Sequence, residues 1–428
     1  MKRVRGFCAV LLGLALVHPA RAENADLAAR GEYLARAGDC IVCHTAPGGQ
    51  SFAGGLKMGT PLGAIYTTNI TPDKDTGIGL YSFEDFERAM RKGIAKDGHR
   101  LYPAMPYPSY AKVSEDDLKA LYAFFMGSVQ PVARANQKSE IPWPLNIRGA
   151  LGVWNVVFAP SIGFSPDAER DAKLNRGAYL VQGLGHCGSC HTPRGIFFQE
   201  KALDDNGKAY LTGGELDNWT ASNLRGDTPG GLARWSEADI TGFLKTGHNR
   251  YATAFGTMID AVNNSTQFLS DDDLAAIAAY LKSLPGKADG GAYLYDAATT
   301  EALRTGAGTP GAGIYVQKCA GCHAMDGRGR EPWLPPLAGN AVVADDDPAS
   351  LINVVLNGSQ RIVVDGMPDE YRMPVFRLLL SDADIAQVLG FVRRGWGNDA
   401  PPVSVKRVAR IRKETEPASD AVSILKMR

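Results

Sequence analysis

The chain has 428 residues, of which 45% are hydrophobic and 21% are charged. This composition is that of a globular protein, and the length allows about two to four domains. The 46 basic and 46 acidic residues give a net charge of zero, so no excess of positive charge indicates a nucleic-acid partner. The 48 glycines and 25 prolines predict long turns and loops.

The N-terminus has the pattern of a secretion signal. Basic residues open the chain, an apolar run covers residues 10–17, and Ala20-Arg21-Ala22 forms a small-x-small cleavage site. The apolar run is too short to cross a bilayer. We therefore expect residues 1–22 to be a signal peptide, and the mature chain to begin at Glu23. The expected location is the periplasmic side of the cytoplasmic membrane.

Six of the seven cysteines form three Cys-x-x-Cys pairs, and a histidine follows each pair directly. The motifs are Cys40-Ile41-Val42-Cys43-His44, Cys187-Gly188-Ser189-Cys190-His191 and Cys319-Ala320-Gly321-Cys322-His323. This pattern attaches c-type haem, because two thiols add to the vinyl groups of one haem and the next residue lies under the iron. The motifs therefore predict three covalently bound haems c, with His44, His191 and His323 as axial iron ligands.

Disulfides and zinc are the two alternative interpretations of the cysteine pairs. An exported chain can form disulfides, but disulfides do not require a histidine after every pair. A zinc site takes four ligands, typically from two such pairs, whereas these pairs lie more than a hundred residues apart. The haem interpretation explains both the pairs and the histidines.

The sequence around the three motifs also repeats. A short predicted helix precedes each motif, at residues 30–34, 176–180 and 313–315. A closing helix with an acidic start follows each motif after a long polar stretch. These starts are Ser114–Asp117, Ser270–Asp273 and Ser381–Asp384, and serine before an apolar-periodic run is an N-cap signal. The predicted fold is all-α, with three tandem cytochrome c-like haem domains and long loops.

The repeats set the expected domain boundaries. The expected segments are a signal peptide at 1–22, a first domain at 23–140, an apolar linker at 141–164, a second domain at 165–285, a flexible linker at 286–304, a third domain at 305–398 and a basic tail at 399–428. The apolar linker is too short and too interrupted to span a membrane. It is expected either to pack between domains or to contact lipid or a partner subunit.

Haem iron in an electron carrier usually binds histidine and methionine, so each unit is expected to supply a methionine. In the second unit Met258 is the only one. In the first unit Met105 lies in a proline-flanked loop that is suited to holding a ligand rigidly. The other methionines of that unit are Met58, Met90 and Met126, of which the last two lie in helical patterns and are expected in the core.

In the third unit Met373 precedes the closing helix at a spacing similar to that of Met105. Met367 is its competitor, and Met325 lies too close to the motif. His99 and His248 are alternative sixth ligands for the first and second haems, because each precedes the expected methionine by a few residues. Their simpler role is that of solvated or hydrogen-bonded loop residues.

The chain as a whole resembles the cytochrome c subunits of the membrane-bound alcohol, gluconate, sorbitol and fructose dehydrogenases of oxidative bacteria. Besides the haem motifs, the resemblance rests on Tyr66-Thr67-Thr68-Asn69-Ile70-Thr71-Pro72-Asp73, Leu101-Tyr102-Pro103-Ala104-Met105-Pro106-Tyr107, Arg148-Gly149, Trp154 and Trp396-Gly397-Asn398. It implies that Met105, Met258 and Met373 are axial ligands. It also implies that electrons come from a catalytic flavoprotein or quinoprotein subunit and pass to membrane ubiquinone.

Substrate oxidation is expected on another polypeptide, because no Gly-x-Gly-x-x-Gly fingerprint follows a predicted strand. One alternative is a self-contained, peroxidase-like haem enzyme, which would need an open sixth position on one iron. The other is a freely diffusing electron carrier. The tail adds a question about the membrane, because Val405, Val408 and Ile411 lie at helical spacing among basic residues. Such a segment is expected either on an anionic membrane surface or solvated or bound to a partner.

Overall fold

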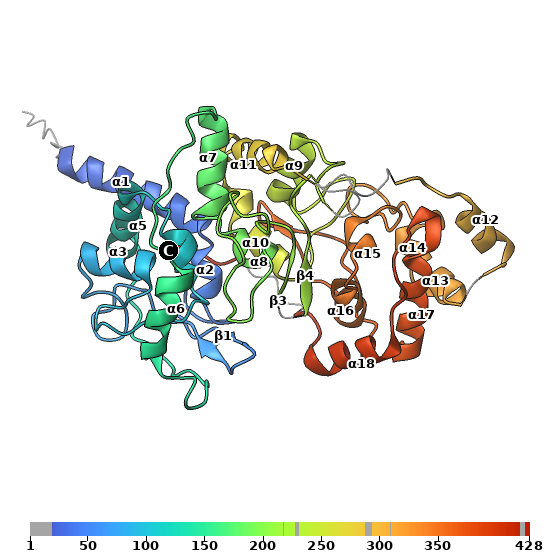
Figure 1. Cartoon of the computed structure of the whole chain (residues 1–428), viewed down its shortest axis with the longest axis horizontal. Coiled ribbons are helices and arrows are strands. Elements are labelled where there is room, and N and C mark those ends of the chain that lie inside the picture. The colour runs from blue at the N-terminus through green and yellow to red at the C-terminus, as the bar shows by residue number, and fades with distance from the viewer. Residues whose placement is uncertain (1–18, 217, 227–230, 287–292, 309, 420–423) are drawn as a thin grey trace, which may run out of the picture.

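The computed structural model describes residues 19–216, 218–226, 231–286, 293–308, 310–419 and 424–428. Most of the predicted signal peptide lies outside these residues, and helix α1 runs through the predicted cleavage point. Three units, each with one Cys-x-x-Cys-His motif, follow one another along the long axis of the molecule (Figure 1). We define the first unit as residues 19–140, the second as residues 165–286 and the third as residues 293–398.

The first unit contains α1 (Pro19–Ala37), α2 (Cys40–Cys43), β1 (Lys57–Met58), β2 (Ile65–Tyr66), α3 (Phe83–Lys92), α4 (Tyr107–Tyr110) and α5 (Glu115–Gly127). The apolar linker holds η1 (Arg148–Ala150) and α6 (Leu151–Phe158). The second unit contains α7 (Ala172–Gln182), α8 (Gly188–His191), β3 (Gly214–Leu216), β4 (Trp219–Ala221), α9 (Glu237–Thr246), α10 (Thr257–Asn264), η2 (Thr266–Phe268) and α11 (Asp271–Ser283).

The third unit contains α12 (Ala298–Thr305), α13 (Ala312–Lys318), α14 (Ala320–His323), α15 (Ala341–Ala344), α16 (Ala349–Asn357), β5 (Val363–Val364), β6 (Met367–Pro368), α17 (Asp382–Val392) and η3 (Gly395–Gly397), and the tail holds α18 (Val405–Glu414). The strands form three antiparallel two-stranded sheets, β1–β2, β3–β4 and β5–β6. The described residues therefore form a helical fold with one small hairpin in each unit, which bears out the all-α expectation in part.

In each unit the helix that precedes the haem motif crosses the closing helix at close range. In the first unit α1 packs on α5, and in the second α7 packs on α11. A Cβ atom on Gly31 would lie 1.9 Å from the Ala120 carbonyl oxygen, and one on Gly177 would lie 2.0 Å from the Ala276 carbonyl oxygen. Glycine is needed here because any side chain would push the helices apart. In the third unit Gly311 makes a similarly close contact with α17.

The first two units pack through two matching sets of contacts. Tyr33 donates to Asp273 of the second unit, and Tyr179 donates to Asp117 of the first unit, each at 2.5 Å. Each carboxylate also binds an arginine of its own unit, Arg30 with Asp117 at 2.6 Å and Arg176 with Asp273 at 2.7 Å. The apolar residues of both units form one continuous core cluster. The repeated Arg-Gly-x-Tyr sequence thus builds a reciprocal interface.

Directional hydrogen bonds join the second unit to the third. The Asn263 side chain accepts from the Val363 N–H at 2.9 Å and donates to the Arg361 carbonyl at 3.0 Å. Beside it, the β3–β4 hairpin contacts α16, where Thr220 and Ser350 share hydrogen bonds of 2.8 and 3.1 Å. These bonds fix the relative position of the two units because both partners are placed by regular elements.

The predicted starts of the closing helices are confirmed. The hydroxyls of Ser114, Ser270 and Ser381 accept hydrogen bonds from the third residue of α5, α11 and α17, respectively. Such N-caps satisfy backbone N–H groups that have no partner within the helix. The apolar residues that follow, among them Leu118 and Leu274, are fully buried.

The apolar linker bridges the first two units on one side. The Trp154 indole donates to the Phe197 carbonyl of the second unit at 2.9 Å, and its ring lies 6.4 Å from the ring of Tyr107 in the first unit. The expected packing role is found on this side. The other side of α6 is exposed, with Val153 at 71% and Val156 at 84% of their full accessibility.

The second linker differs from the expectation of a flexible segment. Part of it, residues 287–292, lies outside the described residues. Residues 298–305 form α12, whose Leu303 is 7% exposed and belongs to the core cluster of the third unit. Tyr295 supports this helix through a hydrogen bond of 2.8 Å with the Thr300 hydroxyl. The expectation is therefore wrong for this stretch, because its apolar side chain is covered.

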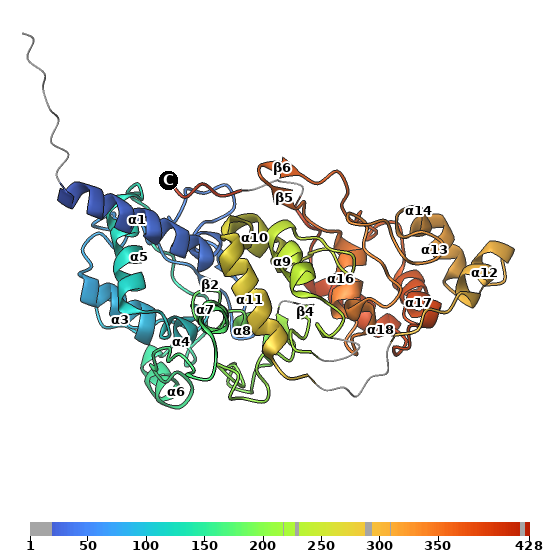
Figure 2. The same cartoon turned by 90° about the horizontal axis from the view of Figure 1, so that it is seen from above.

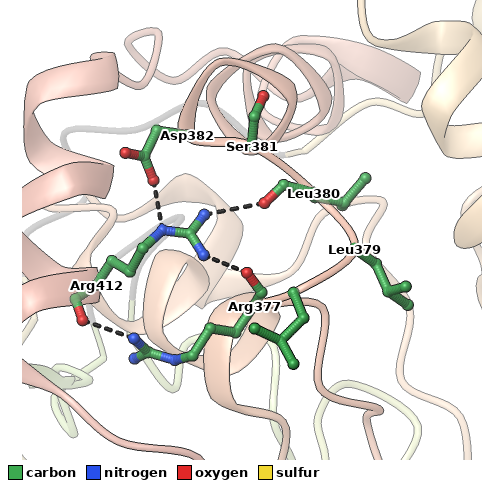
Figure 3. Close-up of a pocket in the computed structure, with 7 residues that line it drawn as sticks. Arg377, Leu379, Leu380, Ser381, Asp382 and Arg412 are labelled. Atoms are coloured by element: carbon green, nitrogen blue, oxygen red, sulfur yellow. Dashed lines mark hydrogen bonds and ion pairs between the residues drawn. The ribbon is translucent and has the colours of Figure 1, made fainter.

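Helix α18 of the tail packs on the third unit. Val408 and Ile411 have no exposed surface and complete its core, so the expectation of a membrane-bound or solvated segment is wrong for them. Arg412 binds Asp382 at 2.7 Å, and Arg377 donates to the Arg412 carbonyl at 2.6 Å (Figure 3). These groups line a shallow pocket, and both arginines are occupied in holding α18 against the loop before α17.

The end of the tail returns to the first two units, where Figures 1 and 2 place the C-terminus. The Leu425 N–H donates to the Asn264 side chain at 2.9 Å, and Arg36 donates to the Leu425 carbonyl at 3.2 Å. Met427 is 4% exposed and lies in the core cluster shared by the first two units. The tail therefore contacts all three units.

Candidate haem sites

Each Cys-x-x-Cys-His motif forms a single helical turn. The N–H of the histidine donates to the carbonyl of the first cysteine, at 3.0 Å for His44 and 2.9 Å for both His191 and His323. Residues three and four positions apart lie on the same face of such a turn. The two thiols and the imidazole of each motif are therefore presented together.

A backbone carbonyl orients each histidine ring. The Nδ1 atoms of His44, His191 and His323 lie 2.7, 2.7 and 3.0 Å from carbonyl oxygens. The carbonyls belong to Thr68, Ser222 and Pro335, respectively. A hydrogen bond at Nδ1 sets the tautomer in which Nε2 carries the lone pair, and it fixes the ring plane. Each ring is thus prepared to bind a metal through Nε2.

Burial controls the protonation of these groups. It raises the pKa of the Cys40, Cys43 and Cys187 thiols to about 12 and that of Cys319 to about 11. It lowers the pKa of all three motif histidines, so the imidazoles are neutral at pH 7. No disulfide joins any of the six motif cysteines.

Met105 and Met373 lie in loops before the closing helices. The Met105 N–H donates to the Tyr102 carbonyl at 3.2 Å, and its carbonyl accepts from the Tyr107 N–H at 2.8 Å. Ser359 holds Met373, since its hydroxyl accepts from the Met373 N–H at 3.0 Å and its N–H donates to the Met373 carbonyl at 3.1 Å. Each methionine is half-buried against the core cluster that contains the first motif cysteine of its own unit.

Met258 has a different setting. It is the second residue of α10 and packs with Phe243 and Ile362 in a small cluster between the second and third units. Cys187 packs instead on the large core of the first two units, and α10 contacts α2 of the first unit. The role of Met258 as sixth ligand of the second haem stays a prediction.

The competing ligands are engaged elsewhere. His248 is buried, with Nε2 2.6 Å from Asp369 and Nδ1 3.2 Å from the Thr253 hydroxyl, so both ring nitrogens already have partners. His99 lies on an exposed turn with its side chain 42% accessible. Met367 is 73% exposed on β6. His248 therefore has no free ring nitrogen for iron, and His99 and Met367 lack the burial expected of an iron ligand.

The carbonyls that orient the histidines were not identified from the sequence, although a signal exists. Two of them precede similar dipeptides, Asn69-Ile70 and Asn223-Leu224. The Asn69 side chain explains the pattern in the first unit, because it donates to the Val132 carbonyl at 2.7 Å and accepts from the Thr71 N–H at 2.9 Å. These bonds fix the loop that carries the carbonyl of Thr68.

The first and second motifs lie next to each other. Cys190 and Asp260 of α10 are close enough to Cys43 for their charges to raise the pKa of its thiol. Asp39, which precedes the first motif, is half-buried at this junction, and desolvation raises its pKa well above its usual range. Tyr110 closes the junction by donating to the Gly38 carbonyl at 3.0 Å. Two haems attached here would be neighbours.

Among the residues that the structure describes, no three His, Cys, Asp or Glu side chains gather in a way that could hold a metal ion. In the same residues no helix is long and apolar enough to cross a membrane.

Comparison with known families agrees with these observations. A cytochrome c model matches residues 28–128 and 174–285. A model described as cytochrome C oxidase, cbb3-type, subunit III matches residues 306–392. Each matched segment contains one motif.

Known relatives cover nearly the whole chain. It is 53% identical to the gluconate 2-dehydrogenase cytochrome c subunit of Pantoea cypripedii, over 91% of this chain and 90% of that protein. It is 50% identical to the alcohol dehydrogenase (quinone) cytochrome c subunit of Gluconobacter oxydans, over 94% and 86%. It is 38% identical to the fructose dehydrogenase cytochrome subunit of Gluconobacter japonicus, over 92% and 84%. The chain therefore belongs to the family of cytochrome c subunits of dehydrogenases, whose cytochrome c domains carry covalently bound haem.

Proposed function

We propose that this chain carries three haems c and passes electrons from a catalytic dehydrogenase subunit to ubiquinone in the membrane. One observation carries the proposal: the same cysteine–histidine turn occurs three times, each time with the histidine Nδ1 bound to a backbone carbonyl. The donor set of each turn, two thiols and a neutral imidazole held through Nδ1, fits one covalently attached haem.

The proposed ligands follow from this fit. The thioether bonds are made by Cys40 and Cys43, Cys187 and Cys190, and Cys319 and Cys322, and the iron ligands are His44 with Met105, His191 with Met258, and His323 with Met373. The haem supplies an iron that cycles between Fe(III) and Fe(II). The protein holds the imidazoles through their Nδ1 bonds, which raises their basicity. Methionine as the sixth ligand raises the reduction potential.

The partners are proposed from the relatives. Their names specify gluconate, alcohol and fructose dehydrogenases, so similar cytochrome subunits serve different substrates. We therefore place substrate oxidation on a separate subunit with a flavin or quinone cofactor. The predicted signal peptide supports export, with the assembled complex on the periplasmic side of the cytoplasmic membrane.

An electron-transfer assay tests the proposal. The purified holoprotein is reduced with dithionite, freed of excess reductant and mixed anaerobically with a short-chain ubiquinone while the reduced haem absorption is followed. We expect ubiquinone to oxidise the haems, and ferricyanide to oxidise them in a parallel sample. Haems that ferricyanide oxidises but ubiquinone leaves reduced would show that ubiquinone is not the acceptor.

A further inference from the structure

The outer side of α6 forms an apolar surface together with the loop after the second haem motif. Ten of the 21 exposed large apolar side chains among the described residues lie between residues 143 and 198. We define the α6 surface by six of these side chains, Trp143, Val153, Val156, Val157, Ile196 and Phe197. No residue of α6 is buried. Exposed apolar patches of this extent mark interaction sites.

The helix and the loop form one surface because aromatic contacts join them. The ring of Phe158 lies 5.6 Å from that of Trp154 and 5.8 Å from that of Phe197. The indole of Trp154 donates to the Phe197 carbonyl. The exposed side chains of α6 and of the loop are therefore held in a fixed arrangement, and the patch is not a set of unrelated residues.

The charges within the linker part of the α6 surface have one sign. Residues 141–166 contain no Asp or Glu, and their only charged side chain is Arg148. Arg148 donates to the Arg100 carbonyl at 2.7 Å, and Arg194 donates to the Phe198 carbonyl at 2.8 Å, so backbone groups hold both guanidinium groups near the patch. In the described part of the chain no carboxylate forms a salt bridge with Arg100 or Arg148. The result is an apolar surface edged by cations.

We propose that the α6 surface docks on an anionic phospholipid bilayer and lies within its interfacial layer. Apolar side chains with tryptophan beside arginine are the composition of segments that rest at this depth. At eight residues α6 is too short to cross, so it lies in the plane of the membrane. A protein partner would instead be matched by about one hydrogen bond per 100–200 Å². The exposed side chains of the patch offer almost no donors or acceptors.

This inference rests on the proposed function and gives it a location. The linker touches Tyr107, two residues after Met105, and Phe197, six residues after His191. A bilayer at the α6 surface therefore lies beside the first and second haem sites. A lipid-soluble quinone would reach these two sites before it could reach the third.

Vesicle flotation of the full-length holoprotein tests the docking surface. The vesicles contain phosphatidylethanolamine with phosphatidylglycerol, and phosphatidylcholine vesicles provide the uncharged comparison. We expect V153D/V156D to lower the partition coefficient on anionic vesicles about tenfold or more, through lost apolar burial and added negative charge. Arg148→Gln is expected to lower it about fivefold, because one cation near the headgroups contributes about 1 kcal/mol.

The matched control places the same two charges outside the patch. L294D/M367D replaces side chains that are 79% and 73% exposed, and β6, which carries Met367, lies on the opposite edge of the molecule from α6 in Figure 2. This control is expected to bind vesicles as the wild type does. Unchanged binding by V153D/V156D, with intact haem spectra, would overturn the proposal.

Two more readouts separate the alternatives. If the α6 surface binds a protein partner, V153D/V156D would no longer co-purify with the dehydrogenase subunit but would still bind vesicles. This result would also overturn the lipid proposal. Reduction of a water-soluble short-chain ubiquinone by V153D/V156D is expected to match the wild type. If the wild type fails to reduce ubiquinone but binds vesicles through α6, the proposed acceptor is wrong and the docking surface stands.

Discussion

Replacing Gly177 by alanine tests whether the close crossing of α7 and α11 stabilises the second unit. Helix propensity alone predicts a gain, because alanine is favoured over glycine by about 1 kcal/mol in a helix interior. The structure predicts a loss. The added Cβ atom would lie 2.0 Å from the Ala276 carbonyl oxygen and 2.7 Å from the Tyr280 Cβ atom.

The size of the loss follows from the contact. Ordinary van der Waals contact begins at 3.4 Å, so the helices would have to separate by more than 1 Å. Separation disturbs Tyr280, which is fully buried and accepts a hydrogen bond from Gln182 at 2.8 Å. Overpacking in a core costs about 1–3 kcal/mol and occasionally more. We expect a net cost of about 2 kcal/mol, which lowers the unfolding midpoint of a unit this size by roughly 8 °C.

The assay is thermal unfolding of the full-length holoprotein. The loss of helix is followed by far-ultraviolet circular dichroism, and the haem environment is followed by visible absorption. Gly242→Ala in α9 is the matched control, because a Cβ atom there meets nothing within 4 Å. It is expected to raise the midpoint slightly through helix propensity. If Gly177→Ala raises the midpoint as Gly242→Ala does, α7 and α11 do not lie close enough to exclude a side chain at residue 177.

The mature protein is expected to have the mass of the polypeptide from Glu23 plus three haems and to keep its colour in denaturing electrophoresis; extractable haem or another stoichiometry contradicts this. Met258→His should remove about a third of the near-infrared sulfur-to-iron band and lower one potential, because imidazole donates more strongly than thioether; an unchanged band excludes Met258 as a ligand. Tyr179→Phe removes a charge-assisted hydrogen bond to the buried Asp117 and should cost about 1.5–3 kcal/mol in guanidinium unfolding, whereas an unchanged midpoint would show that the bond contributes little. Arg412→Leu should release α18 and speed tryptic cleavage of the tail, and a wild-type digestion pattern would refute the clamp.

Patterns with local causes could be predicted from the sequence. The cysteine–histidine turn closes through a hydrogen bond between residues four apart, so it needs no distant partner. The closing helices begin at Ser114, Ser270 and Ser381 because each serine caps its own helix. The chemistry of the candidate sites could likewise be predicted, because the two thiols and the imidazole of each site lie within five consecutive residues.

Contacts between distant residues were decided only by the tertiary structure. The carbonyls that orient the three histidines lie 24, 31 and 12 residues away from them, and no common spacing links these values. Val408 and Ile411 have the same helical spacing whether they face a membrane or a core, and the packing of α18 on the third unit decides for the core. Amphipathic periodicity tells which side chains share a face but not what covers that face. For the same reason the sequence could not decide the role of α6, because no described residue of this chain buries its outer face.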